Sequence, residues 1–100
     1  MEKIKYKMRS RLWLYSGISG WHFITLPKKQ SKEIKKMFSV MAAGWGSLPV
    51  IANIGKTSWK TSIFPDNKIS AYLLPIKLEI RKKEKIVKGD MVDFSIEIKV

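Results

Sequence analysis

Residues 3–15 have the sequence KIKYKMRSRLWLY, in which apolar and cationic side chains alternate almost without interruption. Because successive side chains of a β-strand point to opposite faces, this period of two predicts one long, half-buried strand. One face holds Ile4, Tyr6, Met8, Leu12 and Leu14, and the other holds Lys3, Lys5, Lys7, Arg9 and Arg11. Ser10 interrupts the apolar row, which we interpret as the position of a β-bulge.

A turn and a second strand follow this segment. Residues 16–20 are rich in Ser and Gly and predict a turn, and residues 21–26 are aromatic and β-branched, which is typical of a strand. Pro27 ends that strand. The two strands are expected to form a hairpin.

The next segment predicts a short helix. Ser31 is interpreted as its N-cap and Phe38 as its approximate end, with Ile34, Met37 and Phe38 as the buried stripe. A turn at Gly44-Trp45-Gly46 follows the helix.

The remainder of the chain predicts further strands, separated by turns at Gly55-Lys56, Pro65-Asp66-Asn67 and Gly89-Asp90. These strands are expected at residues 48–54, 57–64, 71–74 and 92–98. Residues 76–86 allow two interpretations. Ile76, Leu78 and Ile80 alternate as in a strand, but the charged residues that follow do not continue the pattern.

A weak internal duplication links the two halves of the chain. Each half contains, in order, a strand, Leu-Pro, a Glu-Ile-(Lys/Arg)-Lys string, a glycine turn and a strand, with the two strings at residues 33–36 and 79–82. If the halves are equivalent, residues 77–84 form a helix like residues 31–38. Two such units suggest an intramolecular pseudo-dimer closed into a β-barrel, which protects strand edges.

Composition limits the functional classes. The chain of 100 residues is expected to be one domain, residues 1–100, with a formal net charge of +12 and no cysteine. A net charge of this size favours a polyanionic partner, although it is also compatible with a role in solubility. No signal peptide is expected, and the uncharged residues 37–55 are too interrupted by Gly, Pro and Asn for a membrane span. We expect a cytoplasmic protein; a monomer is compatible with the sequence, which does not fix the oligomeric state.

The order of several strings resembles a known prokaryotic family. These strings are residues 21–27 (WHFITLP), 44–50 (GWGSLPV), 57–66 (TSWKTSIFPD), 72–75 (YLLP), 80–82 (IRK) and 89–90 (GD). Together they resemble the domain of unknown function DUF1905 over about residues 5–99. The resemblance implies a double-split β-barrel capped by short helices, related in fold to the swapped-hairpin DNA-binding domains of AbrB and MazE type. It implies no activity and no functional residue.

Catalytic and metal-binding patterns are missing from the sequence. His22 is the only histidine, and with no cysteine the chain offers too few ligands for zinc; we expect no metal and no cofactor. His22 shares its face with Ile24 and Leu26, which favours a packed or hydrogen-bonded strand residue. No nucleophilic serine motif occurs, so we expect that the protein is not an enzyme.

The first strand carries the leading functional hypothesis. A straight row of cations repels itself unless anions screen it, and such a row can follow a phosphate backbone. Continued alternation places Trp13 and Tyr15 on the same face, which is the pattern of single-strand binding. We therefore expect a module that binds an anionic polymer, DNA or RNA, and the candidate contacts are Lys3, Lys5, Lys7, Arg9, Arg11 and Trp13. The alternatives are edge-strand protection by the cations and a bulge that turns Trp13 inward.

Three other interpretations stay open. A second basic patch, Lys28, Lys29, Lys32, Lys35 and Lys36, is either a binding surface or an ordinary solvated helix face. A barrel mouth near Trp21, Trp45 and Trp59 is the basis of a protein-interaction or small-ligand module. An enzyme that uses His22 predicts a carboxylate or hydroxyl partner for that side chain.

Overall fold

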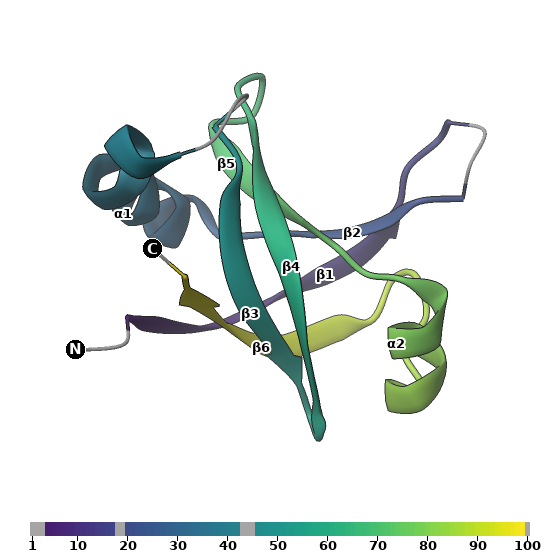
Figure 1. Cartoon of the computed structure of the whole chain (residues 1–100). Coiled ribbons are helices and arrows are strands. Elements are labelled where there is room, and N and C mark those ends of the chain that lie inside the picture. Colours follow the sequence, from purple (N-terminus) through teal and green to yellow (C-terminus); the bar gives the residue numbers. More distant parts are fainter. Residues whose placement is uncertain (1–3, 18–19, 43–45, 100) are drawn as a thin grey trace.

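Six strands and two short helices make up the fold of this computed structural model, which describes residues 4–17, 20–42 and 46–99 (Figure 1). The elements are β1 (Lys5–Leu14), β2 (His22–Thr25), α1 (Lys28–Phe38), the 3₁₀ turn η1 (Ser39–Met41), β3 (Leu48–Ile54), β4 (Thr57–Asp66), β5 (Ala71–Pro75), α2 (Leu78–Glu84) and β6 (Met91–Ile98). The strands close into an antiparallel barrel in the order β1-β2-β5-β4-β3-β6. The prediction of a mainly β barrel with two short helices is confirmed.

The two longest strands each change partner partway along their length. β1 pairs with β6 over residues 5–11 and with β2 over residues 12–14. β4 pairs with β3 over residues 57–63 and with β5 over residues 64–66. Exchanging β1 with β4, β2 with β5 and β3 with β6 leaves every neighbour relation unchanged. This topology is the one expected of two repeated units, and α2 confirms the helix that the duplication predicted for residues 77–84.

The bulge predicted at Ser10 is wrong. Ser10 lies opposite Val92, between the pairs Arg9–Asp93 and Arg11–Met91, so no extra residue interrupts the ladder. Serine is small enough to take an inward position without breaking the pleat. The alternation therefore continues through β1, and Trp13 stays on the face that carries the cations.

Helix α1 begins earlier than the sequence pattern indicated, and Ser31 is not its N-cap. Pro27 occupies the N-cap position, and Ser31 lies buried within the helix. Its hydroxyl donates to the carbonyl oxygen of Leu26 at 3.2 Å and accepts from the backbone N–H of Tyr72 at 3.1 Å. The serine is therefore placed by a contact between α1 and β5.

The buried stripe of α1 is also shifted from the predicted one. It consists of Ser31, Ile34 and Phe38, whereas Met37 is 57% exposed. At about 100° of rotation per residue, Met37 lies roughly 100° away from the centre of the face that Ser31, Ile34 and Phe38 share. The pattern was misassigned because the buried face includes a serine.

The core fills the barrel interior and extends under both helices. Leu12, Ile24, Leu74 and Ile96 are fully buried, and Ile80 of α2 belongs to the same cluster. Figure 1 shows α1 and α2 at opposite ends of the barrel. Within the described residues, no helix is long and apolar enough to cross a membrane.

Candidate nucleic-acid interface

The odd-numbered side chains of β1 form a cation row on the outside of the barrel. Lys5, Lys7, Arg9 and Arg11 are all exposed. Neighbours on the same face of a strand are about 6.8 Å apart, so these head groups share one strip of surface. Lys3, the fifth cation of the predicted row, lies outside the described residues.

Strand β6 places carboxylates beside this row. Nη1 of Arg9 is 2.9 Å from Oδ2 of Asp93, and Glu97 is the register partner of Lys5. The Arg9–Asp93 pair is largely exposed on both sides (59% and 77%), so it contributes at most about 1 kcal/mol to stability. Arg11 instead donates through Nη1 to the carbonyl oxygen of Gly89 at 2.5 Å. The row is therefore partly offset in charge, with Lys7 opposite Ser95.

Trp13 lies on the predicted face, but its ring is already engaged by the protein. Its Nε1 donates to Oγ1 of Thr25 at 2.8 Å, and its ring centroid is 5.3 Å from that of Phe23 at an interplanar angle of 37°. The side chain is half-buried. Among the predicted contact residues that the structure describes, Trp13 therefore offers the least free surface.

Trp13 belongs to a group of four aromatic side chains on the outer face, Trp13, Tyr15, Trp21 and Phe23, which we call the aromatic cluster. Phe23 is its hub: Trp21 stacks on it at 5.9 Å and 18°, and Tyr15 meets it edge-on at 6.4 Å and 89°. Tyr15 and Trp21 are 51% and 52% exposed. Sequence reasoning missed Phe23 and did not join Trp21 to Trp13, although the hairpin register pairs Trp13 with Phe23.

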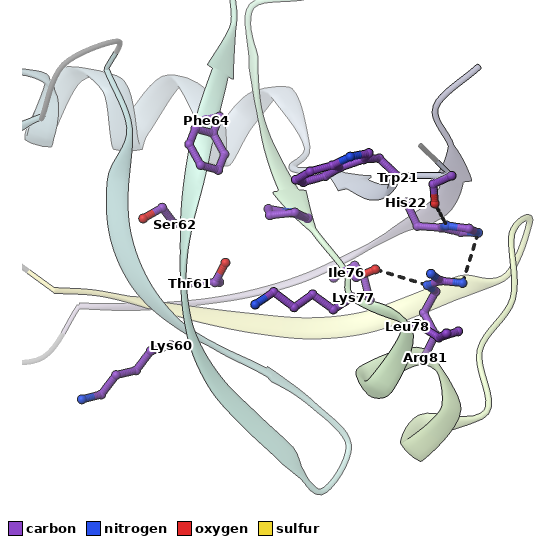
Figure 2. A pocket seen from close by; sticks show the side chains of 12 residues that line it. Trp21, His22, Lys60, Thr61, Ser62, Phe64, Ile76, Lys77, Leu78 and Arg81 are labelled. Atoms are coloured by element: carbon purple, nitrogen blue, oxygen red, sulfur yellow. Dashed lines mark hydrogen bonds between the residues drawn. The ribbon is translucent and has the colours of Figure 1, made fainter. Parts of the chain in front are cut away.

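A groove of about 650 Å³ lies between β2, β5, β4 and α2, and Trp21 is part of its lining (Figure 2). Its lining includes Trp21, His22, Lys60, Thr61, Ser62, Phe64, Pro75, Lys77, Leu78 and Arg81. Of the tryptophans named for the barrel-mouth alternative, only Trp21 is in this lining; Trp45 lies outside the described residues. Trp59 is half-buried against the core, and its Nε1 has no hydrogen-bond partner among the described residues.

His22 is held between a carbonyl group and an arginine. Its Nδ1 lies 2.8 Å from the carbonyl oxygen of Gly20, an acceptor only, so Nδ1 carries a proton and donates. Its Nε2 is 3.5 Å from Nη1 of Arg81, which is the donor in that contact when the ring is neutral. The enzyme alternative predicted a carboxylate or hydroxyl partner for His22, and within the described residues the ring has neither.

The second basic patch lies on α1, near the start of β1. Lys28, Lys29, Lys32, Lys35 and Lys36 are all exposed. Burial and, to a smaller extent, the negative charge of Glu33 on α1 raise the pKa of Tyr6. The electrostatic effect of Glu33 on Tyr6 indicates that α1 lies within electrostatic range of β1.

Among the residues that the structure describes, no three His, Cys, Asp or Glu side chains are grouped to hold a metal ion.

The comparisons with known proteins identify a family without an assigned activity. No curated protein matches the chain. The family described as Domain of unknown function (DUF1905) matches residues 9–96, which include both helices, all of β2, β3, β4 and β5, and the larger part of β1 and β6. The chain therefore belongs to the DUF1905 family.

Proposed function

We propose that this domain is a non-catalytic module that binds single-stranded DNA or RNA along the outer face of β1. The main support is the unbroken alternation of inward and outward side chains along β1, in which four exposed cations are followed directly by the aromatic cluster. Cations that follow the phosphates and aromatic rings that stack with bases are the two components of sequence-tolerant single-strand binding.

The aromatic cluster favours a single strand over a duplex. Tyr15 and Trp21 keep about half of their surface open, while Phe23 fixes both rings from below. Bases of a single strand are free to stack on such rings, whereas those of a duplex are already stacked on each other. Each stacked base contributes about 1–3 kcal/mol, so Tyr15→Leu should weaken binding about fivefold or more.

Salt dependence tests the cation row. Single-strand affinity falls with a log–log salt slope of about 0.7 per neutralised phosphate, so Lys5→Gln/Lys7→Gln should reduce the slope by about 1.4. The matched control is Lys82→Gln/Lys83→Gln, which removes the same charge from exposed positions on α2. The assay is fluorescence anisotropy with a labelled oligothymidylate between about 50 and 200 mM salt, with polyglutamate as a competitor that carries no bases.

Removing the neighbouring carboxylate should act in the opposite direction. Asp93→Asn releases Arg9 from its ion pair and deletes one negative charge beside the row, so nucleic-acid affinity should rise. Equal slopes for the β1 and α2 double variants, or equal affinity for polyglutamate, would mean general charge attraction and would refute the proposal.

We also propose a finer description of the fold. The partner changes of β1 and β4 support a double-split barrel, a pseudo-dimer in one chain of the AbrB and MazE type. A cytoplasmic location is consistent with a nucleic-acid partner and is proposed with it.

A further inference from the structure

The groove beside α2 combines an apolar wall with cations and is separate from the cation row of β1. Its lining runs from Trp21, which directly precedes β2, to Phe64 on β4 (Figure 2), and includes Pro75 of β5. Its volume of about 650 Å³ is within the range of small-molecule sites. None of the residues that line it is on β1 or β6.

Trp21 contributes a half-exposed indole ring to the lining of this groove. Phe23 stacks on one side of the indole, with the two ring centroids 5.9 Å apart, and 52% of the Trp21 side chain stays exposed. Phe64 at the other end of the groove is 41% exposed. A large aromatic side chain that is fixed on one face and open on the other is suited to stacking with a planar ring.

The charges around the groove are all positive. Lys60, Lys77 and Arg81 line it, and no Asp or Glu does so among the described residues. The hydrogen bond from the N–H of Ile76 to the carbonyl oxygen of His22, 2.9 Å long, continues the pairing of β2 with β5, and Lys77 follows directly after Ile76 in the chain. An anionic group in this groove meets cations without competition from carboxylates.

Arg81 is oriented by two contacts of its guanidinium group. Its Nε donates to the carbonyl oxygen of Ile76 at 3.2 Å, and Nη1 lies 3.5 Å from Nε2 of His22. His22 is in turn fixed by Gly20, so its role here is to position the arginine. A guanidinium that is held in place is suited to directional hydrogen bonds with phosphate oxygens.

We propose that the groove binds a nucleoside monophosphate, with the base on the open face of Trp21 and the phosphate at Lys77 and Arg81. The hydroxyl groups of Thr61 and Ser62 line the groove and supply polar contacts for the sugar. The same chemistry exists in a free mononucleotide and at the phosphorylated end of a strand. The site shares Trp21 with the β1 surface but uses Lys77 and Arg81 in place of the β1 cations, so the two sites can be tested separately.

Titration with adenosine 5′-monophosphate, followed by tryptophan fluorescence and by NMR chemical shifts, tests the proposal. Adenosine and inorganic phosphate are the partial probes, and each should bind at least about tenfold more weakly than the nucleotide, because each lacks one half of the interaction. Lys77→Gln/Arg81→Gln should weaken nucleotide binding by about tenfold or more, and Lys77→Gln alone, at an exposed position, should show part of that loss. Lys82→Gln/Lys83→Gln is the charge-matched control.

The aromatic contact has its own matched pair. Trp21→Leu should abolish the fluorescence change and weaken binding, whereas Tyr15→Leu, at an equally exposed position outside the groove, should not. Lys5→Gln/Lys7→Gln should leave nucleotide binding unchanged, so this site and the β1 surface can fail separately. A 5′-phosphorylated and an unphosphorylated oligonucleotide, compared in that β1 variant, distinguish the strand end from the free nucleotide.

Equal binding of nucleotide and adenosine would overturn the proposal, because it would remove the role of the cations. Equal effects of the Lys77/Arg81 and Lys82/Lys83 variants would overturn it as well. So would the absence of any chemical-shift change at Trp21, Lys77 or Arg81 with both the mononucleotide at millimolar concentration and the phosphorylated oligonucleotide.

Discussion

Ser31→Ala should destabilise the protein more than a Ser→Ala substitution at any other serine that the structure describes. Ser31 is 2% exposed, and its hydroxyl accepts the backbone N–H of Tyr72 at 3.1 Å while donating to Leu26 at 3.2 Å. The N–H and C=O of one strand residue point to the same side, and the carbonyl oxygen of Tyr72 accepts from Leu26. Strand β2 ends at Thr25, so Ser31 supplies the acceptor that a longer strand would have provided.

The expected loss of stability follows from the backbone N–H of Tyr72, which loses its acceptor in this variant. A buried N–H without an acceptor costs about 1–3 kcal/mol, and the higher helix propensity of alanine offsets about 0.5 kcal/mol of this cost. The free energy of unfolding should therefore fall by about 0.5–2.5 kcal/mol. For a chain of this size, that corresponds to a Tm about 2–20 °C lower.

Urea denaturation at constant m-value is the primary measurement, with Ser39→Ala at the exposed end of α1 as the control. The control should change the free energy of unfolding by less than about 0.5 kcal/mol. Amide hydrogen exchange adds a local readout, because the Tyr72 N–H should exchange faster in Ser31→Ala than in the control. Equal stability of the two variants and unchanged exchange at Tyr72 would refute the assigned role of Ser31.

Three further predictions concern the core, a turn and the pH dependence. Leu12→Ala should lower the free energy of unfolding by about 2–5 kcal/mol, because Leu12 is fully buried. Leu14→Ala, two residues further on, should lower it by less than about 1 kcal/mol. Similar losses for the two variants in urea denaturation would contradict the burial pattern of β1. Gly55→Ala should lower the free energy of unfolding by about 1 kcal/mol, because Gly55 has a φ of +56° and an added Cβ would displace the Glu84 carboxylate. An unchanged Tm in thermal unfolding would argue against this turn geometry. Burial raises the pKa of Tyr72 above its ordinary value of 10.0, so the unfolded state loses this proton first and stability should fall as the pH rises above 10.0. Tyr72→Phe should remove this part of the decline, and an identical pH profile for the variant would show that Tyr72 does not cause it.

Much of the fold was predictable because its signals are local. Alternation at residues 3–15 is a direct consequence of strand geometry, so the strand and the outward direction of Lys5, Lys7, Arg9 and Arg11 follow from residue order alone. The ambiguity at residues 76–86 is of another kind, because a short apolar pattern suits both a strand and a helix. Comparison with the first half of the chain favoured the helix, which ends at Lys85 in a left-handed conformation.

The wrong predictions for Ser31 and Ser10 both involve partners that are distant in the sequence. Ser31 resembles an N-cap when it is considered alone, and its actual acceptor role depends on Tyr72, 41 residues away. The bulge at Ser10 depended on the ladder with β6, where Val92 simply pairs with it. A single serine between apolar residues carries no information about the strand that will lie beside it.

For the candidate sites, the sequence by itself determined which side chains of β1 face solvent and that cations and aromatics follow each other there. Only the tertiary structure decided that Asp93, 84 residues away, pairs with Arg9, that Phe23 fixes Trp21, and that Trp21 and Arg81 border one groove. The physical reason is that direction within a strand follows from backbone geometry at each residue, whereas neighbours across the barrel follow from strand order and register, which the whole chain sets when the barrel closes.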